Sequence, residues 1–322
     1  MNFQDLEQIE NYQFYLDTAF KKAQKRALVA REQIKSERSI LKKSQMVEMQ
    51  KLSVIRGVLY DRLIEIVKSY PSIDQLPAFY QKLIKITLEY DELKKSLGAV
   101  NWAAKKVNDL FKVYNERIKR TKDFRKINQY RREFYGRVSS LLKQINDNLL
   151  FLENARKIMK GYPTIKTSIP SVVIYGFPNV GKTTLLHKLT GSRPEINSYP
   201  FTTKTINISY MEEGGNKIQL LDVPGTLNRE KQNDIEKQAD LAVVEVAELI
   251  VYVLDLSESY PFSDQIKLLK DIKKFNKKTI LFLSKKDLAG DKIDEFSGMD
   301  FETISEIKDL KKAILNNVST KK

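Results

Sequence analysis

The spacing of apolar positions divides the chain into two parts of different character. Over the first 160 residues apolar side chains recur every three or four positions, as in Leu52, Ile55, Leu59 and Leu63. This is the spacing of one face of a helix. Only three glycines and two prolines interrupt a region rich in Leu, Ile, Lys, Glu and Arg. Such a composition predicts long helices.

Helix boundaries in this region follow from its few breakers. Pro71 should end one helix, and Ser72 with Gln75 resembles a capping box that opens the next. One further helix is expected from about residue 91 to 120. A single long helix is expected from about 121 to 160, ended by the Gly-Tyr-Pro run at 161–163. Because heptads are not sustained, we expect an antiparallel bundle and not an extended coiled coil.

After Pro170 the pattern changes to short, β-branched apolar runs separated by helical stretches. The predicted strands are residues 171–175, 205–211, 217–222, 249–255 and 279–284. Strands that alternate with helices predict an α/β domain with a mostly parallel sheet. The short link MEEGGN, residues 211–216, predicts one hairpin, and hence one antiparallel edge strand. We therefore expect a multidomain chain: an all-α helical bundle, residues 1–165, followed by an α/β domain, residues 166–322.

The net charge of +15 belongs to the helical part alone. Residues 1–170 carry 34 Lys and Arg against 19 Asp and Glu, and residues 171–322 carry 22 of each. The segment 111–137 has ten basic residues, three acids and six interleaved aromatics, and a shorter basic run lies within residues 21–31. Most of these aromatics should face the bundle core, and the charges could form an ordinary solvated face. The asymmetry between the two parts nevertheless favours RNA binding.

Composition also narrows the chemistry. The chain has no cysteine and one histidine, His187. The residues around it predict that His187 lies on the surface of a helix. Disulfides, thiolate zinc sites and a cysteine nucleophile are excluded. No apolar stretch approaches the length of a membrane span, and the N-terminus is polar and acidic. We expect a cytoplasmic monomer with neither zinc nor membrane contacts.

The stretch GFPNVGKTT, residues 176–184, follows an apolar strand and fits a phosphate-binding P-loop. Its glycines allow a tight turn that points backbone N–H groups at phosphates. Lys182 should reach the β- and γ-phosphates, and the Thr183 hydroxyl should bind Mg²⁺. The helix that follows adds its N-terminus to the anion site. The residues of this stretch expected to bind nucleotide are Asn179, Val180, Gly181, Lys182, Thr183 and Thr184.

Two further phosphate motifs stand where a GTPase needs them. Asp222 and Gly225 in LLDVPG form a DxxG arrangement, whose aspartate can hold Mg²⁺ through water and whose glycine N–H can sense the γ-phosphate. YPFTTK, which lies between the motifs, contributes Phe201, Thr202 and Thr203. One of the two threonines should close over Mg²⁺ and the γ-phosphate, and Thr203 is favoured over Thr202. The predicted catalytic groups are thus Lys182, Thr203 and Gly225.

The choice of base depends on FLSKKD. Lys285 and Asp287 lie where a guanine-reading [N/T]KxD element belongs, and that carboxylate can accept two hydrogen bonds that adenine cannot donate. Ser284 replaces the usual asparagine, which should remove both a contact to the base and a brace on the P-loop. Ser305 and Glu306, in TISE, could offer backbone N–H groups to the guanine carbonyl. The serine keeps a P-loop ATPase open as an alternative.

Taken together, these residues resemble a TRAFAC-class GTPase of the Obg-like superfamily. YPSIDQLPAFYQKLI, LGAVNWAAKKVNDLFKVY and the run from IPSVVIY through YPFTTKT resemble the nucleolar GTP-binding protein 1 family in its short archaeal form. The resemblance covers most of the chain. It implies a GTPase that binds GTP, GDP and Mg²⁺ and acts in assembly of the large ribosomal subunit. It also implies rRNA and ribosomal proteins, or a pre-ribosomal particle, as partners.

The resemblance gives Asn179 a specific role. In potassium-stimulated members of this GTPase class the equivalent position binds a monovalent cation beside the phosphates, so K⁺ is a candidate cofactor; otherwise Asn179 braces the loop. Thr226 stands where Ras-like enzymes carry a water-positioning glutamine, which predicts slow intrinsic hydrolysis. A scaffold that binds nucleotide with little hydrolysis remains the alternative function.

Overall fold

A computed structural model of the chain describes residues 3–34, 37–191, 195–198, 205–226, 234–257, 259–286 and 301–318. The chain forms two compact units. The first, here called the helical unit, comprises Gln4–Ser72 and Leu88–Lys160. The second, the α/β unit, comprises Met1–Phe3, Ile73–Thr87 and Gly161–Lys322.

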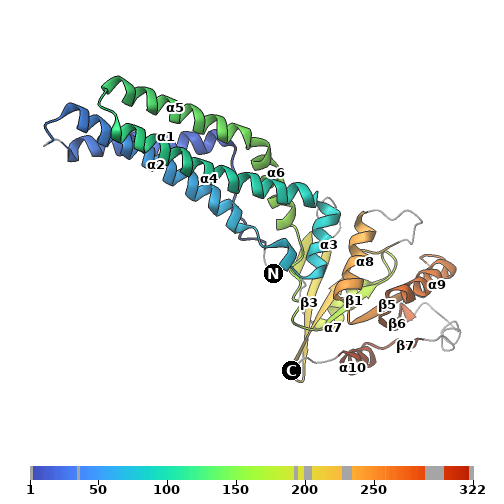
Figure 1. The fold of residues 1–322 in the computed structure, drawn as a ribbon. Helices are drawn as coiled ribbons and strands as arrows, with labels where there is room; N and C mark the ends of the chain where they lie inside the picture. The colour runs from blue at the N-terminus through green and yellow to red at the C-terminus, as the bar shows by residue number, and fades with distance from the viewer. Residues whose placement is uncertain are drawn as a thin grey trace. The chain divides into compact units, whose positions relative to one another are not determined.

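Five long helices build the helical unit (Figure 1). They are α1 (Tyr12–Gln33), α2 (Ile40–Ser69), α4 (Tyr90–Arg120), α5 (Phe124–Gln144) and α6 (Asn146–Lys160). Helices α1, α2, α4 and α5 pack side by side, and α6 packs on α4. Helices α1, α2 and α5 begin after Asn11, Ser39 and Asp123, whose side chains each accept a hydrogen bond from a first-turn N–H. The predicted bundle of long helices is confirmed.

The core of this unit follows the predicted helical spacing. Leu52, Ile55, Leu59 and Leu63 are all fully buried. The expected single helix over 121–160 is instead two helices that meet at Ile145. The break lies immediately before the polar run 146–148, whose two asparagine side chains bond other segments of the helical unit. Asn146 Oδ1 accepts from Tyr12 N–H and Asn148 Nδ2 donates to Ser96 Oγ.

The segment after Pro71 also differs from the prediction. Residues Ile73–Gln75 form a 3₁₀ turn, η1, and the α-helix begins only at Ala78. Pro77 accounts for the delay, because the residue before a proline avoids the helical region. The expected capping box therefore does not open the helix.

A seven-stranded sheet forms the centre of the α/β unit (Figure 1). Its strands are β1 (Ser171–Tyr175), β2 (Glu195–Ser198), β3 (Thr205–Glu213), β4 (Asn216–Asp222), β5 (Leu249–Asp255), β6 (Lys278–Ser284) and β7 (Glu302–Ile304), in the order β2-β3-β4-β1-β5-β6-β7. Strands β4, β1, β5, β6 and β7 are parallel, and β3 runs antiparallel to β4 across the predicted Gly-Gly hairpin. The fold class is confirmed, with the short strand β2 added outside β3.

The helices of this unit are α7 (Lys182–Thr190), α8 (Asp234–Val246), α9 (Phe262–Asp271) and α10 (Ile307–Asn317), with the 3₁₀ turn η2 (Ile272–Phe275). Helix α7 packs on β1, β3 and β4 and against α10, whereas α8 packs on β1. Every residue of β1 and β5 is buried. In parallel sheets ligands bind beyond the carboxyl ends of such central strands. None of the described helices combines the length and apolarity needed to cross a membrane.

One helix from the N-terminal half of the sequence belongs to the α/β unit. Helix α3 (Ala78–Thr87) packs on α8, and Lys82 Nζ lies 2.5 Å from Glu245 Oε1. The fully buried Tyr80 hydroxyl donates to Pro163 O at 2.8 Å and accepts from Ile165 N–H at 2.9 Å. Burial raises the pKa of Tyr80 to about 12, so this hydroxyl stays protonated. The α/β unit is therefore assembled from separate stretches of the chain.

Candidate nucleotide-binding site

The predicted P-loop lies at the carboxyl end of β1 and leads into α7. Gly176 begins the turn with φ 147°, and a Cβ at this position would lie 2.7 Å from Val253 O. Lys182, the first residue of α7, is buried. Its Nζ donates to Phe177 O at 2.6 Å and to Gly176 O at 3.3 Å. The loop thus holds an ammonium group at the helix N-terminus, where an anion is favoured.

Asn179 is an exposed residue of this loop, and its φ is 60°. Asparagine is one of the few residues other than glycine that adopts this left-handed conformation readily. The backbone geometry alone is therefore a sufficient reason for an asparagine here. Potassium binding by its side chain stays a prediction.

Two predicted Mg²⁺ ligands lie next to each other. The Thr183 hydroxyl, on α7, donates to Asp222 Oδ2, at the end of β4, across 2.5 Å. Asn207 Nδ2, from β3, donates to the same oxygen at 2.9 Å, because Asn207 is the cross-strand partner of Asp222. A hydroxyl and a carboxylate form an oxygen donor set of the kind that Mg²⁺ prefers. Asn207 was not predicted, since its contact follows from strand register.

The glycine of the DxxG motif touches the P-loop backbone. A Cβ on Gly225 would lie 2.4 Å from Pro178 N and 2.7 Å from Phe177 C. Only a glycine permits this approach. The next residue, Thr226, is buried. Phe201, Thr202, Thr203 and Asp287, which we also expect at the site, lie outside the described residues.

A cavity of about 780 Å³ adjoins the P-loop. It is lined by Val180, Gly181 and Thr184 from the P-loop, by the end of β6 and by the start of α10. The structure therefore brings Lys285, Ser305 and Glu306 together with the P-loop, as the sequence predicts for a base site. Small-molecule sites in proteins commonly have volumes of this size.

Ser284, at the end of β6, retains contact with the P-loop. Its hydroxyl lies 2.9 Å from Val180 O and 3.0 Å from Leu254 O, and its single hydrogen is shared between them. The expectation that serine removes the brace on the P-loop is therefore wrong. A serine at this position is short enough to bond the Val180 carbonyl directly.

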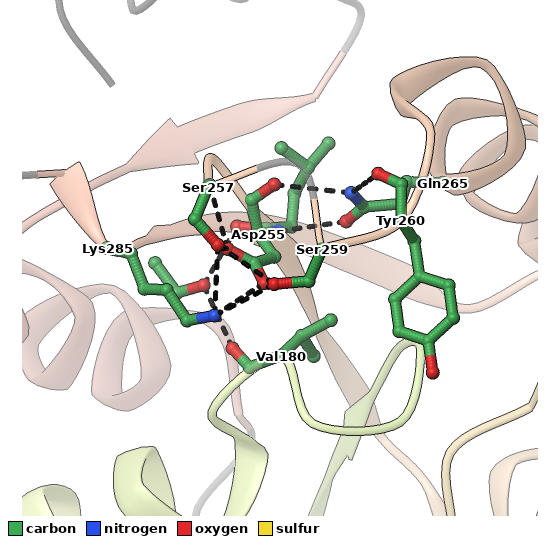
Figure 2. A network of polar contacts seen from close by, with 9 residues as sticks. Val180, Asp255, Ser257, Ser259, Tyr260, Gln265 and Lys285 are labelled. Carbon is green, nitrogen blue, oxygen red and sulfur yellow. Dashed lines mark hydrogen bonds and ion pairs between the residues drawn. The ribbon is translucent and has the colours of Figure 1, made fainter. Parts of the chain in front are cut away.

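Lys285 anchors a polar network that the sequence did not predict (Figure 2). Its Nζ donates to Asp255 Oδ2 at 2.7 Å, to Ser257 Oγ at 3.0 Å and to Ser259 Oγ at 3.3 Å. The Asp255 side chain is 0% exposed. Burial alone would raise the pKa of Asp255, but the hydrogen bonds from Lys285 and Ser257 outweigh it and hold that pKa below its usual range. Asp255 is therefore a buried, ionised carboxylate.

The backbone around Asp255 is also fixed. Gln265, on α9 and fully buried, accepts from Asp255 N–H at 2.9 Å and donates to Asp255 O at 3.2 Å. The same amide donates to Tyr260 O at 3.0 Å. Tyr252 OH in turn donates to Gln265 O. The only signal in the sequence was an aspartate at the end of an apolar strand, which does not identify its partner.

Comparison with known proteins places this geometry in a family. The NOG1 N-terminal helical domain matches residues 3–166, and the domain described as 50S ribosome-binding GTPase matches residues 171–286. The chain belongs to the nucleolar GTP-binding protein 1 family. Its C-terminal part carries the P-loop GTPase domain of that family, which implies binding of GTP and GDP.

Individual members of the family match across both units. Uncharacterized protein MJ1408 of Methanocaldococcus jannaschii is 42% identical over 266 residues, which are 81% of this chain and 75% of that protein. Nucleolar GTP-binding protein 1 of Drosophila melanogaster is 32% identical over 71% of this chain and 36% of that protein. The chain spans 36% of the length of the Drosophila protein and 49% of the length of nucleolar GTP-binding protein 1 of Encephalitozoon cuniculi.

Among solved structures, the G domain of the T. maritima FeoB iron transporter covers 46% of this chain and 98% of its own length. The two share 25% sequence identity with a TM-score of 0.40. A superposition this loose carries no functional argument.

Proposed function

We propose that this protein binds GTP, hydrolyses it slowly to GDP and phosphate, and acts as a switch in assembly of the large ribosomal subunit. The observation that carries this proposal is that the P-loop borders both a candidate phosphate site and a candidate base cavity. The P-loop holds Lys182 beside the Thr183–Asp222 pair, and it also borders the cavity that contains Lys285, Ser305 and Glu306. A phosphate site and a base site are thus contiguous.

On the phosphate side, we assign charge stabilisation to Lys182 and the P-loop N–H groups. An ammonium group fixed at a helix N-terminus suits the β- and γ-phosphates. Gly225 packs on Pro178, which supports a role for its N–H near the γ-phosphate. Phosphoryl transfer needs positioning and electrostatic stabilisation far more than covalent chemistry. These groups supply both.

The residues present fit a magnesium ion. The Thr183 hydroxyl and the Asp222 carboxylate are adjacent oxygen donors, and Asn207 orients the carboxylate. We propose that Thr183 binds Mg²⁺ directly, that Asp222 acts through water, and that Thr203 completes the set. Bound Mg²⁺ would neutralise charge on the phosphate oxygens.

Slow turnover follows from the residue after the DxxG motif. Thr226 is 1% exposed, so its side chain is not available in this arrangement to orient an attacking water. The described part of the site offers no histidine or carboxylate general base in that place. A slow hydrolysis step suits a switch, because the GTP-bound state must persist long enough to act before it is converted to the GDP-bound state.

On the base side, we propose that Lys285 and Asp287 select guanine. Ser305 and Glu306 immediately precede α10 and line the cavity, which supports a contact from their N–H groups to a base carbonyl. The Ser284–Val180 hydrogen bond replaces the brace that an asparagine provides. Ser284 therefore fills the part of the asparagine's role that braces the P-loop.

The helical unit is proposed to dock on rRNA. Nine of the ten basic side chains in the segment 111–137 are exposed, whereas Tyr114 and Phe134 are buried in the core. Phe124, at the start of α5, is 49% exposed beside Arg125 and Lys126. Clustered basic groups contact phosphates, and an exposed ring can stack on an unpaired base.

Two measurements test the proposal. The purified protein should release phosphate from GTP over many turnovers, Lys182→Ala should abolish this release, and GDP should bind more tightly than ADP. Absent turnover would favour the scaffold alternative, and equal affinity for ADP would favour the ATPase. Nucleotide-dependent co-sedimentation with large-subunit particles tests the ribosomal role, and crosslinking then maps the contacts.

A further inference from the structure

Lys285 has a backbone conformation that needs an explanation. Its φ is 56°, in the left-handed region that a residue with a long side chain rarely adopts. Such a conformation is unfavourable for a residue that carries a Cβ, and it persists only where surrounding contacts determine it. The contacts that determine it lie at the end of the neighbouring strand β5.

The ammonium group of Lys285 is fully paired. It has three donor hydrogens, and the carboxylate of Asp255 and the hydroxyls of Ser257 and Ser259 lie within 3.3 Å of it. Asp255 Oδ1 is occupied by two hydrogen bonds from Ser257, one from N–H and one from the hydroxyl. The ion pair therefore has a defined geometry on both sides, as Figure 2 shows.

The position of Asp255 is itself imposed by the fold. The residue ends β5, and its backbone N–H and C=O both bond the buried amide of Gln265. A carboxylate with no solvent exposure is costly to bury unless it is paired and hydrogen-bonded. Here every one of its polar groups has a partner, so Asp255 provides a rigid anchor.

This anchor acts on the proposed base site through the lysine side chain. Lys285 lines the cavity beside Val180 and Gly181, and its side chain is 34% exposed. Because both its backbone and its Nζ are fixed, the four methylenes between them are held as an apolar wall. A wall fixed before the ligand binds avoids the entropy loss of ordering a long side chain.

We infer that Asp255 is a positioning residue for guanine recognition: with Ser257, Ser259 and Gln265 it fixes Lys285 as a preformed wall of the base cavity. The inference rests on the proposed function. It also accounts for Ser284. Ser284 is held on Val180 and Lys285 is held on Asp255, so the geometry of these two residues does not depend on an asparagine carboxamide.

The test is Asp255→Asn, which keeps the shape of the side chain and removes its charge. We expect the Kd for GDP, measured by calorimetric titration, to rise about tenfold or more, as befits a charged hydrogen bond. The kcat at saturating GTP should be unchanged, because the wall contributes equally to binding of substrate and transition state. Asp264→Asn, which removes an exposed carboxylate from the next helix, is the matched control and should retain the wild-type Kd.

A double-mutant cycle separates positioning from mere stabilisation. If Asp255 acts through Lys285, then Asp255→Asn combined with Lys285→Met should bind GDP no more weakly than Lys285→Met alone. Independent, multiplying effects on Kd would overturn the inference, and so would a wild-type Kd for Asp255→Asn. Should Asp255→Asn fail to fold, Ser257→Ala removes one donor to the carboxylate and should weaken GDP binding about twofold to fivefold; an unchanged Kd would then overturn the inference.

The same titrations keep the two proposals distinct. If the wild-type protein binds ADP as tightly as GDP, the proposed guanine site is wrong. If the wild type prefers GDP while Asp255→Asn binds like wild type, only the positioning role of Asp255 is wrong.

Discussion

Replacement of Gly225 by alanine tests whether the close contact between the DxxG motif and the P-loop is required. The added methyl would lie 2.4 Å from Pro178 N, 2.6 Å from Pro178 Cα and 2.7 Å from Phe177 C. All three are backbone atoms, so no side chain can rotate away to make room. To reach even 3.0 Å, the shortest separation that real Cβ contacts show, the backbones must separate by 0.6 Å, the difference between 3.0 and 2.4 Å.

The two ways of relieving this clash have different costs. If both loops stay in place, overpacking costs about 1–3 kcal/mol, which lowers the unfolding temperature by about 2–4 °C for each kcal/mol in a unit of this size. If residue 225 moves away from Pro178, stability is preserved but the N–H proposed to sense the γ-phosphate is displaced. A displacement approaching 1 Å can reduce a rate about 100-fold. We therefore expect Gly225→Ala to hydrolyse GTP at least about tenfold more slowly.

The assay is single-turnover phosphate release from GTP, together with thermal unfolding of the same samples. Gly98→Ala is the control, since Gly98 is exposed on α4 and a Cβ there would meet nothing within 4 Å. It should leave hydrolysis unchanged and raise stability by about 0.5–1 kcal/mol, because glycine in a helix is unfavourable. Wild-type hydrolysis and wild-type unfolding temperature for Gly225→Ala would refute the reasoning.

Three further predictions concern the cation, the pH dependence and the RNA surface. GTP hydrolysis should be faster in potassium than in sodium, and Asn179→Ala should remove the difference; equal rates of the wild type in both salts would contradict a cation site. Burial alone would raise the pKa of Glu153, but hydrogen bonds from Arg156 and from Ile9 N–H outweigh burial and lower that pKa. The ionised carboxylate therefore stabilises the helical unit at pH values above the usual carboxyl pKa, about 4.3, and this stabilisation is lost as the pH falls through the lowered pKa. Glu153→Gln should therefore flatten acid unfolding below about pH 5, and an unchanged acid transition would speak against this role. Combined Arg125→Ala and Lys126→Ala should weaken RNA binding and reduce the slope of log K against log salt by up to about 2, and an unchanged slope would place the phosphate contacts elsewhere.

Sequence patterns predicted most elements of the fold because long elements carry repeated signals. Helix α4 begins within one residue of its predicted start, and β1, β5 and β6 agree with their apolar runs to within one residue. The P-loop, DxxG and base motifs were found because each needs particular residue types at fixed spacing. The structure places the described members of these motifs around one loop.

What the sequence could not predict depends on contacts between distant residues. The strands β2 and β7 have four and three residues, too short to show a periodicity. The partner of Lys285 lies 30 positions earlier, and the bond from Ser284 to Val180 spans 104 positions. Local propensity likewise gave no reason to place α3 in the α/β unit, since that placement depends on contacts with α8 and with residues 163–165.

The membership of α3 in the α/β unit has a consequence for how the protein is made. Ribosomes synthesise proteins from the N-terminus at about 5–20 residues per second. Lys82 precedes its partner Glu245 by 163 positions, so roughly 10–30 s pass between their emergence. During that interval α3 lacks α8, on which it packs in the folded unit, and its apolar side chains, among them Phe79 and Leu83, lack part of their final surroundings. The nascent chain must therefore keep this helix from aggregating until α8 has been translated.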